Sequence, residues 1–313
     1  MASRFARSLF AHSALDAFLP STHLVSASWL AANLSSVTIL DASWYLPSAS
    51  RDAAAEYALG PRIPGARFFD IDALSDRSSP LPHMLPAASE LAAAAASLGV
   101  SLGRPVVVYD GAGLFSAARV WWSLRALGHA RTAVLDGGLP GWVAGGHPVE
   151  RGAPPPLAPI AVESGWRLRE GAVRSLAQVV HNALQPQGEL LVDARPAARF
   201  AGEAPEPRAG AARGHVPRSR SVPASSLLDA SDHNRLLPAE ALERVLRAAG
   251  VPPEWGPRPI VTSCGSGVTA CIVSLALTMT GRPLEATALY DGSWAEYGCA
   301  AEAPKCVGPP EAV

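Results

Sequence analysis

A single cysteine in a glycine-containing loop is the part of this sequence best suited to covalent chemistry. The loop spans residues 264–269, reads CGSGVT, and lies between apolar runs at 259–261 and 270–279. These runs predict a buried strand followed by a helix. Backbone N–H groups in the loop and the positive end of the helix dipole would both stabilise a thiolate on Cys264. A buried structural cysteine would not need two glycines around it, so the loop predicts a nucleophile.

Phosphate chemistry is the main alternative for such a loop. A phosphatase would have an arginine six residues after the cysteine, and this position is Ala270. Without a guanidinium, the loop offers no bidentate charge partner for phosphate. Nucleophilic catalysis by Cys264 instead needs a thiolate and N–H donors for the negative charge that develops beside it. The amides of residues 265–270 could supply these donors, because Gly265 and Gly267 allow the backbone to turn inward.

The spacing of the four cysteines predicts no metal site and no disulfide framework. Cys264 and Cys271 are seven residues apart, as are Cys299 and Cys306, and no histidine lies close in the sequence to either pair. Zinc sites typically have ligands separated by two to four residues. We therefore expect no metal and no cofactor, and a buried thiol at Cys271. Cys299 and Cys306 lie in a tail of small residues, where they could form an oxidisable pair.

The chain repeats itself with a period of roughly 150 residues. Four landmarks recur in the same order, with an offset that drifts from 152 to 155: residues 39–43 match 191–195, 63–66 match 216–219, 106–111 match 260–265, and 135–138 match 290–293. This order predicts a tandem duplication. Where the second unit has Cys264, the first has Asp110, which offers no thiol for covalent catalysis. The first unit is therefore predicted to be catalytically silent.

Each unit alternates short β-branched runs with helical stretches such as 87–98 and 238–249. This alternation predicts an α/β fold in which each unit is a parallel sheet flanked by helices on both faces. A proline-rich stretch at 152–159 predicts a stiff linker. The expected segments are a flexible or transit-like N-terminus at 1–23, a silent domain at 24–150, the linker at 151–164, a catalytic domain at 165–305 and a tail at 306–313.

The sequence resembles the two-domain rhodaneses, most closely the members that use 3-mercaptopyruvate. The resemblance covers roughly residues 24–298. It is carried by the Cys264 loop, the DGSW run at 291–294, and three runs of the first unit, DASWYLP at 41–47, FDID at 69–72 and HMLP at 83–86. It implies two tandem rhodanese-like domains, the first silent and completing the cleft, and sulfur transfer from a small-molecule donor through a Cys264 persulfide. The implied acceptors are a thiol, with thioredoxin as the protein candidate, or cyanide.

The charge of the loop separates two sulfur donors. Thiosulfate is a dianion, and the members of the resembled family that prefer it carry basic residues directly after the cysteine. Here these positions are Gly265 and Ser266, which are uncharged. A neutral loop favours 3-mercaptopyruvate, whose charge lies on its carboxylate, away from the transferred sulfur. A thiosulfate:cyanide sulfurtransferase is the alternative, and a non-catalytic rhodanese-type binding module would require a missing cysteine or a broken loop.

The resemblance assigns further residues to the site. It implies that Arg199 and Arg208 bind the substrate carboxylate, for which an arginine fork is suited; the neighbouring Ala204 departs from the threonine often found there. By local sequence alone, pairing of both arginines with Glu203 or Glu206 in solvent is the better explanation. The substrate-binding prediction comprises Arg199, Arg208, Gly265, Gly267, Val268 and Thr269.

Release of pyruvate also needs a proton, which Ser266 could donate or relay if a base stood behind it. The resemblance implies that His83 and Asp72 of the first domain complete a Ser–His–Asp arrangement with Ser266. By local sequence, a histidine in a proline-rich loop would be a surface residue. The predicted catalytic residues are Cys264, Ser266, His83 and Asp72. Four other aspartates are predicted to anchor loops by accepting backbone N–H groups, Asp41 and Asp193 after corresponding strands, and Asp136 and Asp291 at tight turns.

Composition predicts a soluble globular protein that binds neither nucleic acid nor membranes. The formal net charge is −1, hydrophobic residues make up 49% and charged residues 17%. No apolar run reaches the ~18 residues that span a bilayer. The first fifteen residues contain Arg4, Arg7 and three serines, with no acidic residue before Asp16. This pattern is typical of a short organellar transit peptide or of a disordered terminus, so we expect a mitochondrial or cytoplasmic protein rather than a secreted one.

Overall fold

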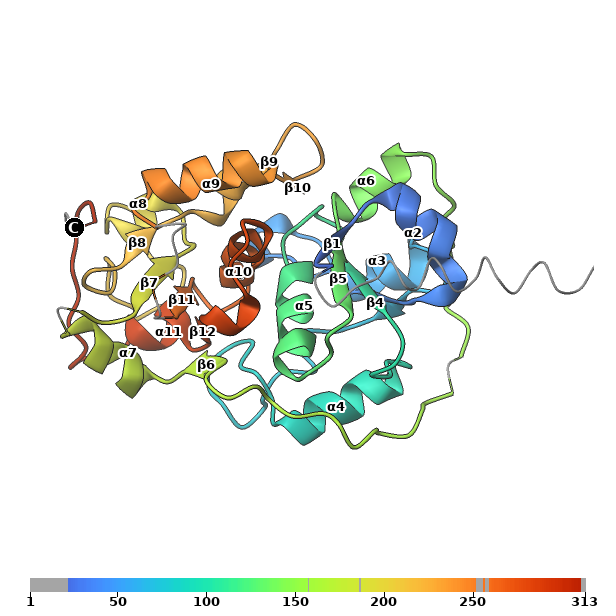
Figure 1. Cartoon of the computed structure of the whole chain (residues 1–313), viewed down its shortest axis with the longest axis horizontal. Helices are drawn as coiled ribbons and strands as arrows, with labels where there is room; N and C mark the ends of the chain where they lie inside the picture. Colours follow the sequence, from blue (N-terminus) through green and yellow to red (C-terminus); the bar gives the residue numbers. More distant parts are fainter. Residues whose placement is uncertain (1–21, 157, 186, 252–255, 257–258, 311–313) are drawn as a thin grey trace, which may run out of the picture.

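The computed structural model shows two five-stranded parallel sheets, one from each half of the chain (Figure 1). It describes residues 22–156, 158–185, 187–251, 256 and 259–310. In spatial order, the first sheet contains β1 (Leu24–Val25), β5 (Thr132–Leu135), β4 (Val106–Tyr109), β2 (Thr38–Asp41) and β3 (Arg67–Phe68). The second contains β6 (Val173–Arg174), β12 (Thr287–Tyr290), β11 (Ile260–Ser263), β7 (Leu190–Asp193) and β8 (Arg220–Ser221).

The two sheets have the same topology and the same register. Asp41 pairs with Tyr109 in the first sheet, and Asp193 pairs with Ser263 in the second. Both pairs fall at the carboxyl ends of the two central strands. The predicted fold class is confirmed.

Helices flank each sheet. The helices of the first domain are α2 (Ala27–Asn33), α3 (Ala53–Leu59), α4 (Ala88–Ser97), α5 (Ala117–Ala126) and α6 (Gly138–Ala144). The second has α7 (Leu176–Ala183), α8 (Ala197–Phe200), α9 (Ala239–Ala248), α10 (Ala270–Met279) and α11 (Ser293–Tyr297). A hairpin of β9 (Leu228–Asp229) and β10 (Arg235–Leu236) precedes α9, and four 3₁₀ turns lie at 34–36, 47–49, 224–227 and 284–286. The helices expected at 87–98 and 238–249 are α4 and α9.

The two domains pack through α5 and α10, which lie side by side near the centre of Figure 1. Both helices are almost entirely buried, since α10 is mostly apolar and α5 contributes Trp121 and Trp122. One hydrophobic cluster includes these tryptophans together with Leu275 and Leu277 of α10. The apolar side chains of α5 and α10 therefore belong to one hydrophobic core that both domains share. This shared core fixes the position of one domain relative to the other.

Backbone hydrogen bonds attach the linker segment and the C-terminal segment to the two domains. The segment expected as a linker has no helix or strand among its described residues, and the amide of Ile160 donates to the carbonyl of Ala96 at 3.2 Å. Near the C-terminus, Cys306 exchanges backbone hydrogen bonds with His215, and Gly308 donates to Ala201. The transit-like pattern of residues 1–21 lies outside the described residues.

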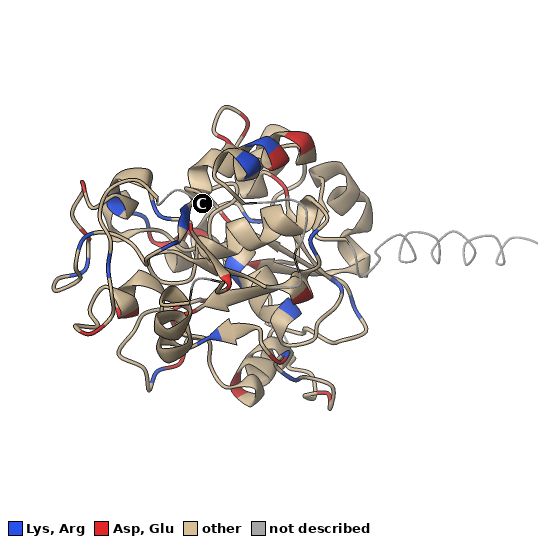
Figure 2. Ribbon diagram, turned by 60° about the vertical axis from the view of Figure 1, so that its left-hand side comes forward, with Lys and Arg blue, Asp and Glu red and all other residues tan. Residues whose placement is uncertain are grey.

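Charged residues of both signs are interspersed along the ribbon (Figure 2), in agreement with the near-zero net charge. Among the described helices, none combines the length and the apolar character required to cross a membrane.

Candidate active site

Cys264 lies directly after the carboxyl end of β11, where a loop leads into α10. This edge of an open parallel sheet is where α/β proteins bind ligands. The backbone of Cys264 is fixed by α11, because its N–H donates to Ser293 Oγ at 3.2 Å and its carbonyl accepts from Trp294 N–H at 2.9 Å. The residue is 2% exposed. The predicted nucleophile therefore has a rigid backbone and little contact with bulk water.

The loop after Cys264 presents a row of unused N–H groups. Among the described residues, no acceptor receives a hydrogen bond from the amides of 265–270. Gly267 has φ of +79°, and a Cβ at this position would crowd Asp291. Val268 and Ala270 are buried, and α10 begins at Ala270, so the helix dipole adds positive potential here. The loop can hold an anion next to the sulfur of Cys264.

The first domain shows what such a loop can hold. At the position that matches Cys264, the carboxylate of Asp110 accepts the N–H groups of Ala112, Phe115, Ser116 and Ala117 at 2.8 to 3.0 Å. Asp110 is fully buried. In the register of the repeat, three of these four donors match Ser266, Thr269 and Ala270, whose N–H groups are unused in the second domain. The first loop is thus filled by its own carboxylate, and the second is open.

A histidine from the first domain reaches the cysteine loop of the second. His83 Nδ1 lies 2.9 Å from Ser266 Oγ, and His83 Nε2 lies 3.1 Å from Asp72 Oδ1. The other oxygen of Asp72 accepts a hydrogen bond from Trp44 Nε1 at 2.9 Å, and the Trp44 ring packs edge-on against His83. If Nε2 carries the proton that faces Asp72, Nδ1 is free to accept the proton of Ser266.

The charge of Asp72 favours this arrangement. Hydrogen bonding from His83, and additionally from Trp44, lowers the pKa of Asp72 below its ordinary value of 3.8. The partners therefore favour the charged form of the carboxyl, and so does water, since 63% of the side chain is exposed. His83 itself is 7% exposed rather than the surface residue that its local sequence would suggest.

The two arginines predicted to bind substrate differ in their surroundings. Arg199 forms a bidentate ion pair with the buried Glu206, at 2.5 Å from Nη2 to Oε2 and 3.2 Å from Nε to Oε1. A Cβ added to Gly265 would lie 3.5 Å from Arg199 Nη2, so the guanidinium borders the cysteine loop. Arg208 is half-buried, and its side chain forms no hydrogen bond or ion pair with the described residues.

The alternative pairing with Glu206 is thus present for Arg199, but in a buried network rather than in solvent. Glu206 also binds Arg195 Nη1 at 2.8 Å, and Arg195 binds Asp193 at 2.7 Å. Two carboxylates and two guanidinium groups balance in charge. One side of the Arg199 guanidinium is occupied by Glu206, and Nη1 has no hydrogen-bond partner among the described residues.

The predicted loop anchors behave in two ways. Asp41 accepts the N–H of Ser43, and Asp193 accepts that of Arg195, as expected after corresponding strands. Asp136 and Asp291 differ from the expectation, because among the described residues the side-chain partners of both lie in the other domain. Asp136 instead accepts Leu236 N–H of the second domain at 3.0 Å. Asp291 accepts Leu85 N–H of the first domain at 2.6 Å and pairs with Arg119.

The other cysteines do not form a second centre. Cys271 is fully buried, and burial strongly raises the pKa of its thiol, which remains protonated. Cys299 is exposed. Within the described ranges, no group of three or more His, Cys, Asp or Glu side chains is arranged to hold a metal ion.

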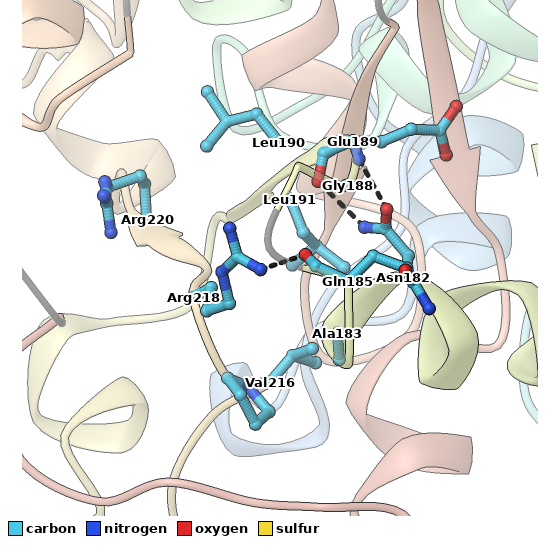
Figure 3. A pocket seen from close by; sticks show the side chains of 11 residues that line it. Asn182, Ala183, Gln185, Gly188, Glu189, Leu190, Leu191, Val216, Arg218 and Arg220 are labelled. Atoms are coloured by element: carbon cyan, nitrogen blue, oxygen red, sulfur yellow. Dashed lines mark hydrogen bonds between the residues drawn. The ribbon is translucent and has the colours of Figure 1, made fainter. Parts of the chain in front are cut away.

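A hollow of about 280 Å³ lies elsewhere in the second domain (Figure 3). It is lined by polar groups such as Asn182 and Arg218 and by Leu190 and Leu191, which begin β7. Cys264 follows the carboxyl end of the neighbouring strand. The hollow therefore lies at the opposite edge of the sheet and is not part of the cysteine site.

Comparison with known proteins decides the family. The model of the rhodanese-like domain matches twice, at residues 26–145 and 176–298. The chain belongs to the rhodanese family. Its two rhodanese-like domains match the two sheets, and only the second carries a cysteine at the end of the central strand.

Relatives of this chain are similar over most of its length. The mitochondrial thiosulfate/3-mercaptopyruvate sulfurtransferase 1 of Arabidopsis thaliana is 42% identical over 90% of this chain and 77% of the relative. The 3-mercaptopyruvate sulfurtransferase of Escherichia coli K12 is 39% identical over 91% of this chain and 98% of the relative. The crystal structure of SseA from Escherichia coli, described with the 3-mercaptopyruvate sulfotransferases, superposes with a TM-score of 0.76 at 39% identity, covering 88% of this chain and all of that one.

Three residues of this site were not anticipated from the sequence. Arg119 is a charged residue within the buried stretch 117–124 of α5, which was the available indication. Ser293, within the quoted DGSW run, fixes the backbone of Cys264 through its hydroxyl. Glu206 was considered only as a solvent partner of the arginines.

Proposed function

We propose that this rhodanese is a 3-mercaptopyruvate sulfurtransferase that carries sulfur on Cys264. The observation that supports this most directly is the contact of Ser266, two residues after the nucleophile, with His83, whose other ring nitrogen contacts Asp72. A proton relay at this place suits a donor whose leaving group is a carbanion or enolate. The relatives named 3-mercaptopyruvate sulfurtransferase, at about 40% identity over most of the chain, give independent support.

In the first step, the Cys264 thiolate attacks the sulfur of 3-mercaptopyruvate, and the bond between this sulfur and the methylene carbon breaks. The electron pair stays with the carbon as the enolate of pyruvate. The proton of the substrate thiol passes to this carbon through Ser266 and His83, so pyruvate leaves and a persulfide anion remains on Cys264. General acid–base help of this kind contributes about 10²- to 10⁴-fold in rate.

The unused amides of residues 265–270, including those of Gly265, Gly267, Val268 and Thr269, would stabilise the outer sulfur of the persulfide. This part of the proposal is supported by the matching amides of the first domain, which hold the carboxylate of Asp110. Arg199 and Arg208 would bind the substrate carboxylate, Arg199 through the Nη1 side that Glu206 leaves open.

In the second step, a thiolate or cyanide attacks the outer sulfur and releases Cys264 as thiolate. We propose thioredoxin as a protein acceptor on the family resemblance. We also propose that residues 24–150 form the silent domain and 165–305 the catalytic domain, with the linker at 151–164, the tail at 306–313 and a transit-like segment at 1–23. The mitochondrial relative of Arabidopsis thaliana supports a mitochondrial location, and a cytoplasmic one is the alternative.

A second candidate is the use of thiosulfate, because the Arabidopsis thaliana relative is named for both donors. The two donors can be separated by the relay, since sulfite leaves thiosulfate without taking a proton. We expect the wild type to have the higher kcat/KM with 3-mercaptopyruvate. Ser266→Ala and His83→Asn should lower kcat with this donor by about 10²-fold. A clear preference of the wild type for thiosulfate would reverse the assignment of the donor.

A further inference from the structure

A single buried arginine is bonded to the backbone on both sides of the proton relay. Arg119 lies on α5 of the first domain, and its side chain is 4% exposed. Its Nη2 donates to the carbonyl oxygen of His83 at 2.7 Å, and its Nη1 donates to that of Gly267 at 3.3 Å. Gly267 directly follows Ser266. The same guanidinium therefore links the backbone of His83 to that of the residue after Ser266, and the side chains of His83 and Ser266 must meet across the domain interface.

Asp291 holds this arginine from the second domain. Its Oδ1 lies 2.5 Å from Arg119 Nη1, and its Oδ2 accepts the N–H of Leu85 at 2.6 Å. The side chain of Asp291 is 2% exposed. The ion pair thus fixes the segment 83–85 at two points, the carbonyl of His83 and the amide of Leu85.

His83 needs such support because of its backbone conformation. Its φ of +60° lies in the left-handed region, which residues with a side chain rarely adopt. A conformation of this kind persists where the surroundings determine it, and it is frequent at functional sites. With its carbonyl bound to Arg119, the ring of His83 can point both nitrogen atoms at their partners, Ser266 and Asp72.

We propose that Arg119, held by Asp291, is a positioning residue that keeps His83 within hydrogen-bonding distance of Ser266. The inference rests on the proposed function, because it concerns the relay that protonates the pyruvate enolate. Arg119 acts through His83 rather than on the substrate. The positioning therefore matters most for a donor whose leaving group takes a proton, and less for thiosulfate.

The silent side of the interface supplies a matched control. There Asp136 accepts the N–H of Leu236, and Arg235 lies 3.7 Å from the Asp136 carboxylate. Two residues before Leu236, Asn234 stands where His83 stands before Leu85, and it donates to the carbonyl of Ala112 at 2.9 Å. Ala112 matches Ser266 in the register of the repeat. Arg235 is thus an interface arginine paired with the corresponding aspartate, but no relay depends on it.

The test compares Arg119→Lys with Arg235→Lys in steady-state kinetics. Lysine keeps the charge beside each aspartate but cannot reach several acceptors as the guanidinium fork does. We expect Arg119→Lys to lower kcat with 3-mercaptopyruvate about tenfold or more, with KM within about twofold, since the relay contributes about 10² or more. The loss with thiosulfate should be at least about tenfold smaller by the same reasoning. Arg235→Lys should keep both activities within about twofold.

A double-mutant cycle with His83→Asn decides whether Arg119 acts through the histidine. In the His83→Asn background, Arg119→Lys should cause no further loss of kcat with 3-mercaptopyruvate. If the losses of kcat from the two substitutions were additive, or if Arg119→Lys lowered kcat equally with both donors, the positioning role would be overturned. Arg119 would then only stabilise the loop in general. Normal kcat in His83→Asn would instead refute the relay of the proposed function. If Arg119→Lys does not fold, Asp291→Asn enters the same cycle, because it removes the charge that holds the arginine.

Discussion

Replacing Glu206 by glutamine should weaken the binding of mercaptopyruvate while leaving both substrate arginines in place. The Glu206 side chain is 3% exposed and binds Arg199 at 2.5 and 3.2 Å and Arg195 at 2.8 Å. It fixes the plane of the Arg199 guanidinium next to the cysteine loop. Glutamine keeps the size of the side chain but removes its charge, and its amide can accept at only one of the two oxygen positions.

The size of the effect follows from the hydrogen bonds that change. A hydrogen bond to a charged group contributes about 1.5–3 kcal/mol. Misorientation of one of the two arginines that bind the carboxylate should cost about the lower value, because Arg199 keeps its charge, and each 1.4 kcal/mol is about tenfold in affinity. We therefore expect KM for 3-mercaptopyruvate to rise about tenfold, with a smaller change in kcat.

Stability should fall as well. The variant leaves one positive charge in the Asp193–Arg195–Glu206–Arg199 network uncompensated, and breaking a fully buried pair costs about 3–5 kcal/mol. Arg199 is 23% exposed, so solvent reduces the penalty, and we expect about 2 kcal/mol from equilibrium urea unfolding. The control is Glu203→Gln, three residues away in the same loop, because Glu203 is exposed. Equal KM values in the two variants would refute the orientation of Arg199 by Glu206.

Two further predictions concern the first domain. Asp110→Ala should reduce the free energy of unfolding by about 3 kcal/mol or more while kcat is kept. Four N–H groups, two of them buried and two half-buried, lose their acceptor, and each buried one costs about 1–3 kcal/mol. Unchanged urea unfolding would contradict this. Asp72 has a lowered pKa, so its contribution to stability is present above the ordinary value of 3.8 and is lost as the pH falls through the lowered pKa. The wild type should therefore lose more stability than Asp72→Asn on acidification below about pH 4, and parallel curves of unfolding free energy against pH would rule this out.

The fold was predictable because the sequence contains two copies of the same pattern of strands and helices. Buried parallel strands appear as short apolar runs, and the same runs recur near 106 and 260 with an aspartate or a cysteine directly after them. Two copies in the same order restrict the topology, and both sheets have the same strand order. The helix after Cys264 was predicted to its exact ends because α10 is mostly apolar and is followed shortly by Gly281.

The site was predictable only in part. The Cys264 loop could be interpreted from local sequence, since its nucleophile and amide donors are adjacent in the chain. His83 and Ser266 are 183 residues apart, and only a family resemblance could join them before the structure was known. For Arg119 and Asp291 even that was insufficient, because their pairing depends on how α5 meets the second domain. A buried charge pair between domains leaves no periodic pattern in a sequence.

The most direct test of the central claim is the intact mass of the protein after exposure to 3-mercaptopyruvate without an acceptor. The account predicts a gain of one sulfur atom, mapped to Cys264 by peptide analysis, removed by an added thiol and absent in Cys264→Ser. Pyruvate should appear in equal amount. Pyruvate release without a mass gain, or a gain of sulfur that persists in Cys264→Ser, would contradict the assignment of Cys264 as the sulfur carrier.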